Sequence, residues 1–137
     1  MTSIVEYTGE LRTVCTHLRS ENSFETDAPV DNNGKGERFS PTDLLATSLG
    51  TCMLTVMGIK AKNMGFDLNG IKIEVEKIMR SDPRRVSGIN LLFHIPDQLK
   101  TVDEKTKQIL KQTGRTCPVW LSIHPDIEVN VDWEVWS

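Results

Sequence analysis

The sequence lacks most of the features that mark exported and membrane-bound proteins. Its three cysteines are too few for a disulfide-stabilised secreted scaffold. Its first residues, MTSIVEYTGE, contain no basic segment followed by an apolar core, so we predict no secretory signal. No apolar run approaches the roughly 18 residues of a typical membrane span. Together these absences predict a cytoplasmic protein with no membrane partner.

Several catalytic and binding motifs are also missing. The net charge of −3 and the pI near 5.6 give no electrostatic reason to expect a nucleic-acid partner. The sequence contains no G-x-S-x-G motif, no glycine-rich phosphate loop and no nucleic-acid-binding motif. In a reducing compartment, paired cysteines are more often redox-active, catalytic or metal-binding than structural. The cysteines are therefore the first candidates for function.

The hydrophobic patterning predicts one α+β domain over residues 1–137. Alternating residues predict two short strands within residues 4–18, which turn at Gly9, and a hairpin over residues 71–95. Residues 25–37 are rich in Asp, Asn and Gly, which is typical of a loop. The remainder is predicted as an amphipathic helix over residues 101–114, one or two helical turns in TCPVWLSI, and a closing strand over residues 126–136.

A long helix is predicted from Pro41 to Asn63. Ser40 is a favourable N-cap, Pro41 fits the first helical position, and Asp43 stands where a capping box needs an acceptor. Gly65 is a natural C-terminal stop.

The faces of this helix suggest a second chain. Apolar residues cover most of its circumference, which is typical of a helix buried on nearly all sides. A short chain has little material for that burial, and the middle of the helix holds small residues, including Gly50. We therefore predict a homodimer in which a second copy packs on this helix. The alternative is a monomer in which Gly50 is an ordinary packing residue of a core helix.

The residues alone assign different characters to the cysteines. Cys52 lies in the apolar helix and suits the role of a small buried hydrophobe, which would need an external cation to become reactive. Cys117 precedes Pro118 at a predicted helix start, where unpaired N–H groups favour the thiolate, so we expect a lowered pKa for Cys117. Cys15 is expected to be non-catalytic. A zinc site formed by Cys52, Cys117 and one histidine stays an alternative, although no C-x-x-C pair supports it.

Two segments resemble the OsmC/Ohr family of thiol-dependent peroxidases. They are SPTDLLATSLGTC, which ends at Cys52, and TCPVWLSIHPDIEVNVDWEV, which contains Cys117. The family pattern places a proline and a carboxylate at the start of a long helix, a cysteine near its middle, and a later Cys-Pro before the final strand. The resemblance extends roughly from Arg38 to Trp133. It implies an OsmC/Ohr-like fold, with antiparallel sheets around a long central helix, in an intertwined homodimer.

The resemblance also implies the chemistry. Cys52 would be the peroxidatic thiolate, and Cys117 would resolve its sulfenic acid as a disulfide. The substrates would be organic hydroperoxides, with hydrogen peroxide as a second substrate. The apolar residues Leu49, Met53 and Val56 favour a substrate with an organic tail. No metal, haem or flavin cofactor is implied, and an external dithiol reductant is required.

In this family an arginine, oriented by a carboxylate, keeps the attacking thiol ionised. Arg38 in GERFSP is the best match, and Arg12 and Arg19 on the N-terminal strands are further candidates. The alternative for Arg38 is a solvated loop charge.

The carboxylate is where the sequence departs from the family pattern. Many members have Glu directly after the proline, where this chain has Thr42, and Asp43 follows one position later. Asp43 would lie about 13 Å along the helix axis from Cys52 and on the opposite side. It would therefore act across the dimer or through Arg38, or else only complete the cap with Ser40. The departure at Thr42 supports an alternative function, a non-catalytic thiol redox sensor or a small-molecule-binding dimer.

Overall fold

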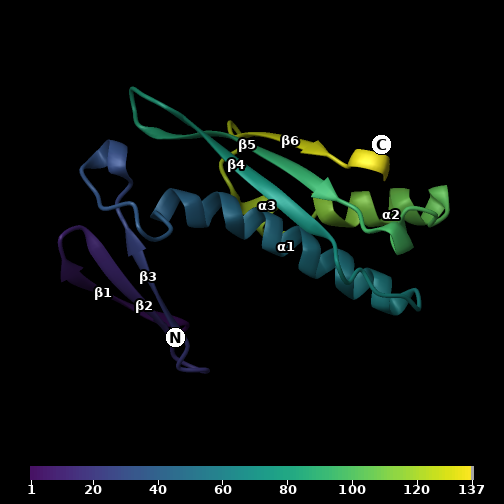
Figure 1. Cartoon of the computed structure of the whole chain (residues 1–137), viewed down its shortest axis with the longest axis horizontal. Coiled ribbons are helices and arrows are strands. Elements are labelled where there is room, and N and C mark those ends of the chain that lie inside the picture. Colours follow the sequence, from purple (N-terminus) through teal and green to yellow (C-terminus); the bar gives the residue numbers. More distant parts are fainter. Residues whose placement is uncertain (137) are drawn as a thin grey trace. The chain divides into compact units, whose positions relative to one another are not determined.

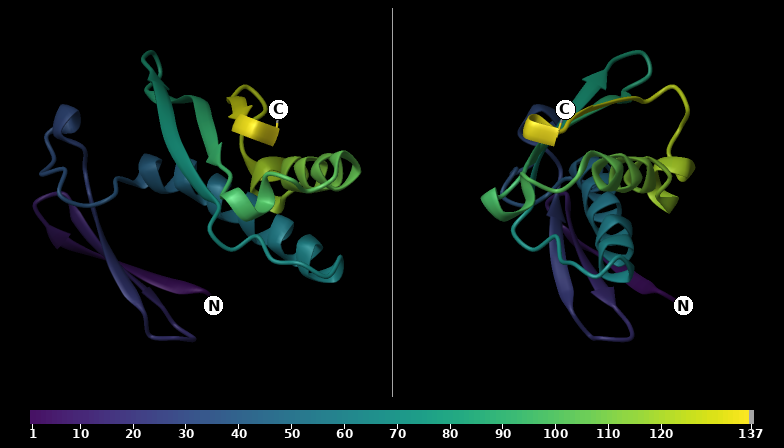
Figure 2. Two further views of the ribbon diagram at one scale, coloured as in Figure 1. Left: turned by 45° about the vertical axis from the view of Figure 1, so that its right-hand side comes forward. Right: turned by 90° about the vertical axis from the view of Figure 1, so that its right-hand side faces the viewer.

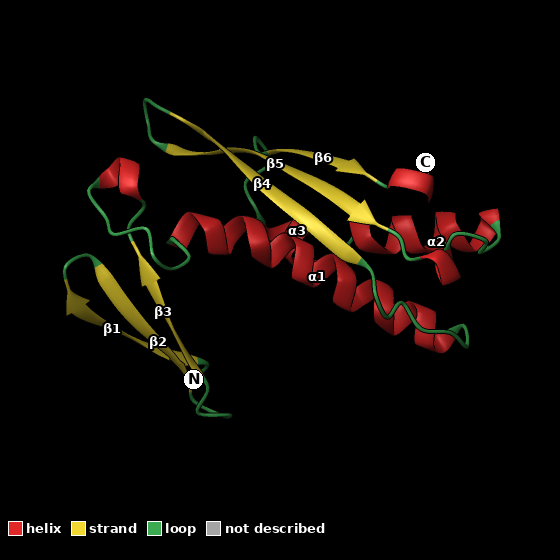
Figure 3. Cartoon of the chain, viewed as in Figure 1, coloured by secondary structure: helices red, strands yellow, loops and turns green. Residues whose placement is uncertain are grey.

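The computed structural model describes residues 1–136, which form two compact units (Figures 1 and 3). The first unit comprises Met1–Leu45 and the second begins at Ala46, so the long helix α1 belongs to both. The helices and strands are β1 (Ser3–Gly9), β2 (Arg12–His17), β3 (Ser23–Asp27), α1 (Pro41–Asn63), β4 (Lys72–Arg80), β5 (Arg85–His94), α2 (Glu104–Arg115), α3 (Pro118–Ser122) and β6 (Glu128–Asp132). Short 3₁₀ turns occur at Val30–Asn32, Asp97–Leu99 and Glu134–Trp136.

The first unit is built on the antiparallel sheet β1-β2-β3. The predicted hairpin is confirmed, and its turn takes left-handed backbone conformations at Gly9, Glu10 and Leu11. The strand β3 was not predicted, because its last residues fall in the segment 25–37 that was assigned to a loop. That prediction is wrong for Glu25–Asp27, which pair with β2 in the register Arg12 to Asp27. Thr26 and Asp27 are buried with their side chains in hydrogen bonds, and both are polar, so they leave no hydrophobic signal in the sequence.

The first unit has no apolar core of its own. Within residues 1–45 the buried side chains are Thr26, Asp27 and Ser40, all of which are polar. The large hydrophobic side chains that remain exposed are Met1, Ile4, Val5, Tyr7, Leu11, Leu18, Phe24, Val30, Phe39 and Leu45. A sheet normally needs one covered apolar face to be stable. Within a single chain this sheet therefore has little hydrophobic stabilisation.

The second unit holds the hydrophobic core, between sheet β4-β5-β6 and helices α1 and α2 (Figures 1 and 2). Strands β4 and β5 form the predicted hairpin, in the register Lys72 to His94. β6 lies parallel to β5, so the expectation of purely antiparallel sheets is wrong here. The reason is the connection, because the chain crosses from β5 through α2 and α3 before it returns to the sheet.

Helix α1 has the predicted bounds, and one of its faces packs into the core. The buried residues of α1 are Ala46, Leu49, Gly50, Met53, Met57 and Ala61. On the opposite face Thr51, Thr55 and Ile59 are exposed. A single chain therefore does not bury α1 on nearly all sides, as the apolar pattern predicted. By length and composition alone α1 could cross a membrane, but the core helix of a soluble protein passes the same test. Its buried face identifies it as part of the core.

Two glycines mark where helix α1 meets its neighbours. A Cβ atom at Gly50 would lie 3.4 Å from Val75 Cγ2 and 3.7 Å from Ile73 Cδ1, both on β4 of the same chain. The argument that Gly50 receives a second chain is therefore wrong, and Gly50 is a packing residue of the core. A Cβ atom at Gly114 of α2 would lie 2.9 Å from Met57 Sδ, which explains how α2 approaches α1 so closely.

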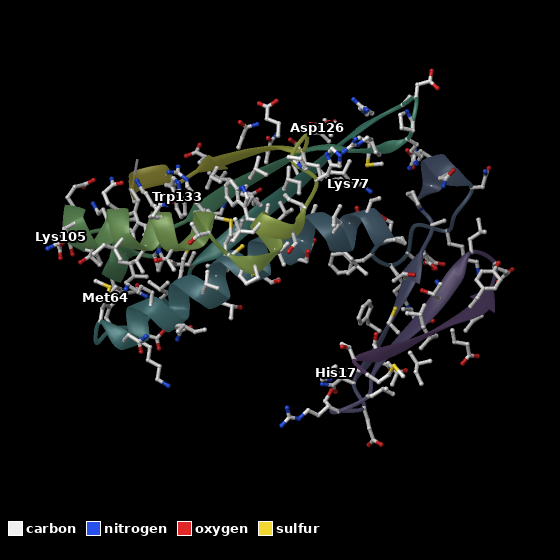
Figure 4. The ribbon with its side chains drawn as sticks, turned by 180° about the vertical axis from the view of Figure 1, so that it is seen from behind. His17, Met64, Lys77, Lys105, Asp126 and Trp133 are labelled. Atoms are coloured by element: carbon white, nitrogen blue, oxygen red, sulfur yellow. The ribbon has the colours of Figure 1, made fainter. Side chains whose placement is uncertain are left out.

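The C-terminal residues close the core. Trp133, labelled in Figure 4, stacks on Phe93 with ring centroids 4.3 Å apart, and Lys111 Nζ lies 5.9 Å from its ring. Trp136 is fully buried and donates its indole N–H to the carbonyl of Leu99 at 2.9 Å. The predicted final strand ends at Asp132, and residues 134–136 form a 3₁₀ turn instead.

Candidate functional site

The structure brings Cys52 and Cys117 together in the second unit. Cys52 lies in the middle of α1 and is half-buried, whereas Cys117 is 1% exposed and belongs to the core. The two side chains lie close enough to interact, since Cys52 contributes to the raised pKa of Cys117. All three cysteines, including Cys15 on β2, are free thiols. Two residues that are far apart in the sequence thus form a pair of neighbouring thiols, as the family resemblance implies.

Local sequence fixes the position of Cys117. It is the N-cap of α3, Pro118 occupies the first helical position, and the Cys117 sulfur accepts the N–H of Trp120 at 3.4 Å. Burial raises the pKa of Cys117, and the interaction with Cys52 raises it further. The N–H of Trp120 lowers this pKa, but by less than burial raises it. The expectation of a lowered pKa is therefore wrong. Desolvation prevails because α3 has only five residues and the thiol is enclosed.

In the first unit, Arg12 is the arginine that a carboxylate holds most firmly. Its Nε and Nη2 donate to the two carboxylate oxygens of Asp27 at 2.7 and 2.8 Å, and Asp27 is 1% exposed. This bidentate pair raises the pKa of Arg12 and lowers the pKa of Asp27. Glu25 and Glu37 also lie 3.7 and 3.5 Å from the guanidinium. No local pattern in the sequence marks Asp27, because its place opposite Arg12 depends on the pairing of β3 with β2.

The other two arginines are held less firmly. Arg38 is 47% exposed, forms an ion pair with Glu25 at 3.3 Å and donates to the carbonyl of Glu37 at 3.0 Å. It is therefore not a freely solvated loop charge. Arg19 is exposed in the turn after β2. The geometry consequently favours Arg12 over Arg38 as a carboxylate-oriented cation.

Asp43 forms the predicted cap at the start of α1. Its carboxylate accepts the backbone N–H of Ser40 at 2.9 Å, and Ser40 Oγ accepts the N–H of Asp43 at 3.0 Å. The hydroxyls of Thr42 and Ser40 are 3.2 Å apart. The capping role is thus confirmed, and any role of Asp43 in chemistry stays a prediction.

The histidines do not support the zinc alternative. His94 contacts the carboxylates of Glu74 and Glu134, which raise its pKa, and His124 accepts the N–H of Asp126 at 3.0 Å. Within residues 1–136, no three His, Cys, Asp or Glu side chains gather as metal ligands.

Comparison with known proteins assigns the family. The family model described as OsmC-like protein matches residues 34–132. The chain belongs to the OsmC-like family. No curated protein matches it.

One solved structure is that of a protein from Psychrobacter arcticus, described as an osmotic stress induced and detoxification response protein. Its sequence is 54% identical to this OsmC-like chain. It has a TM-score of 0.91, and the match covers 96% of this chain and 94% of that one.

Two more distant structures, each 17% identical, share the fold. One is an organic hydroperoxide resistance protein OsmC from Legionella pneumophila, with a TM-score of 0.72 and 96% of each chain covered. The other is the organic hydroperoxide resistance protein OhrB of Bacillus subtilis, with a TM-score of 0.64 and 98% of each chain covered.

Proposed function

We propose that this OsmC-like protein is a thiol-dependent peroxidase that reduces organic hydroperoxides, and hydrogen peroxide as a second substrate. The observation that carries the proposal is the neighbouring pair of thiols, Cys52 half-exposed and Cys117 enclosed. The names of the Legionella and Bacillus relatives are consistent with this substrate class. The protein would act in the cytoplasm.

The reaction has two steps. The Cys52 thiolate attacks one peroxide oxygen, the O–O bond breaks, and the alkoxide leaves with the electron pair, so that Cys52 becomes a sulfenic acid. The Cys117 sulfur then displaces the oxygen from Cys52 as water, and the disulfide forms. An external dithiol returns both cysteines to thiols by exchange. No cofactor takes part in this sequence.

The attacking thiolate needs a cation, and we assign that role to an arginine of the first unit. Arg38 is the candidate that the family motif favours, whereas Arg12 is the candidate with a fixed orientation, supplied by Asp27. Asp43 is retained as a candidate that orients Arg38, in addition to its cap. Single Arg12→Met and Arg38→Met variants distinguish them, because only the arginine that serves Cys52 should slow sulfenic acid formation.

A homodimer is part of the proposal, since two surfaces of the single chain need a cover. The first unit exposes Val5, Tyr7 and Phe24 on one sheet. On α1, Thr51, Thr55 and Ile59 are exposed and uncharged, and the two threonine hydroxyls donate to backbone carbonyls of the same helix. A second copy of the chain would cover such surfaces symmetrically.

A second function remains a candidate, a non-catalytic thiol sensor or a small-molecule-binding dimer. The observation that favours it is Thr42 in place of the family glutamate, together with the engagement of Arg12 by Asp27, Glu25 and Glu37. A guanidinium held by three carboxylates has less positive charge to offer a thiolate.

Stopped-flow consumption of tert-butyl hydroperoxide with a dithiol reductant separates the two functions. A peroxidase turns over repeatedly, and Cys52→Ser should abolish that turnover while the matched Cys15→Ser variant retains it. A sensor would be oxidised once without catalytic consumption. Turnover that survives in Cys52→Ser would refute the proposed role of Cys52.

A further inference from the structure

The first step of the proposed reaction needs a proton. When the O–O bond breaks, the leaving alkoxide carries a negative charge, and it is a poor leaving group unless an acid protonates it. Arginine can stabilise this charge but does not give up its proton in proteins. An acid positioned near the Cys52 sulfur would therefore accelerate this step.

Cys117 is the candidate acid beside Cys52 in the second unit. Its thiol lies within interaction range of the Cys52 side chain, which packs against the same core cluster, and it is 1% exposed, so bulk water does not surround it. The groups that shift its pKa are Cys52, the backbone N–H groups of Trp120 and Val119, and its own burial. Because its pKa is raised, Cys117 keeps its proton in the resting protein.

We propose that Cys117 donates its proton to the leaving alkoxide before it acts as the resolving nucleophile. This second role rests on the peroxidase function proposed above. The Cys52 thiolate takes one oxygen from the hydroperoxide, and the other oxygen leaves with the electron pair and takes the Cys117 proton. The products are the alcohol, the Cys52 sulfenic acid and the Cys117 thiolate.

The second step follows from the first without a further base. The Cys117 thiolate attacks the Cys52 sulfur, forms the S–S bond and displaces hydroxide. Atoms and charge balance, because one thiolate, one thiol and one hydroperoxide give one disulfide, one alcohol and one hydroxide. The enclosed thiol is thus converted to its reactive form only after peroxide has been reduced, which keeps it unreactive in the resting protein.

The test compares two electrophiles at Cys52 in a Cys15→Ser background. Sulfenic acid formation with tert-butyl hydroperoxide is measured in a single turnover, by timed quenching with dimedone and mass spectrometry. Alkylation of Cys52 by iodoacetamide is measured in the same variants by peptide mapping. Iodide leaves without a proton, so alkylation reports how available the Cys52 thiolate is, independently of any acid.

Cys117→Ala and Cys117→Ser are the informative variants, because serine keeps a hydrogen-bonding group that is a far weaker acid. Loss of a general acid typically costs about 10²-fold or more. We expect the peroxide reaction to slow by about that factor in both variants, while alkylation changes only a few-fold.

Equal slowing of both reactions would overturn the proposal, since Cys117 would then act on the thiolate or on the structure. An unchanged peroxide rate would overturn it as well, leaving Cys117 only the resolving role. If the unmodified protein forms no sulfenic acid, the proposed peroxidase function itself fails, and this outcome is distinct from both.

Discussion

Gly50 offers a sharp test of how helix α1 packs, because two substitutions there should change stability in opposite directions. Its position in the helix interior is regular, and its Cβ site faces β4 of the same chain. In Gly50→Ala, the new methyl group would lie 3.4 Å from Val75 Cγ2 and 3.7 Å from Ile73 Cδ1, which are ordinary van der Waals distances. The helix then gains about 0.5–1 kcal/mol from the lower backbone entropy of alanine.

Gly50→Leu should have the opposite effect. The three carbon atoms beyond Cβ would enter the space that Val75 and Ile73 already fill. Overpacking of this kind typically costs about 1–3 kcal/mol. The two variants should therefore differ by roughly 2 kcal/mol or more in the free energy of unfolding.

Denaturant unfolding, followed by tryptophan fluorescence at one fixed protein concentration, measures this difference. Gly58→Ala is the matched control, because among the described residues no atom beyond its chain neighbours and the nearby backbone of its own helix lies within 4 Å of its Cβ position. It should show the gain in helix propensity alone. If Gly50→Leu is as stable as the unmodified protein, or if Gly50→Ala is less stable by about 1 kcal/mol, the packing of α1 on β4 is wrong.

Three further outcomes are expected. One equivalent of hydroperoxide added to a Cys15→Ser variant should yield an intrachain Cys52–Cys117 disulfide by peptide mapping; only mixed or interchain disulfides would contradict the resolving role of Cys117. The unfolding midpoint of the unmodified protein should rise with protein concentration, because association stabilises the folded chain; a stable micromolar monomer in sedimentation would contradict the dimer. Asp27→Asn should lower the melting temperature at neutral pH. Arg12 lowers the pKa of Asp27 from 3.8, so the stabilisation from their ion pair is present above that pH and is lost as the pH falls through the lowered pKa. The melting temperatures of Asp27→Asn and of the unmodified protein should therefore converge in acid. A constant difference between them down to pH 2 would refute this.

The sequence predicted the elements whose signals are local. The capping box of Ser40 and Asp43 determines where α1 begins, and the alternation in residues 71–95 determines the β4–β5 hairpin. Both depend on residues a few positions apart. The direction of β6 depends instead on how α2 and α3 return the chain to the sheet, which no local pattern encodes.

The site was predictable to different extents in the two units. The pairing of Cys52 with Cys117 came from family resemblance, and spacing alone would not have indicated it. The lowered pKa expected for Cys117 failed, because a helix start reveals unpaired N–H groups but not the desolvation that outweighs them. Asp27 was missed because the buried end of β3 is held by an ion pair with Arg12 and contains no hydrophobic residue.

The polar interior of the first unit has a consequence for the life of the protein in a cell. Residues 1–45 are synthesised before the second unit, yet they bury no hydrophobic side chain that could make them fold by themselves. If the proposed homodimer forms, their strands would stay accessible to chaperones and proteases until the second copy covers them. Newly made protein would then be degraded when it is scarce and protected when it is abundant. The lifetime of each molecule would thus depend on how many others are present.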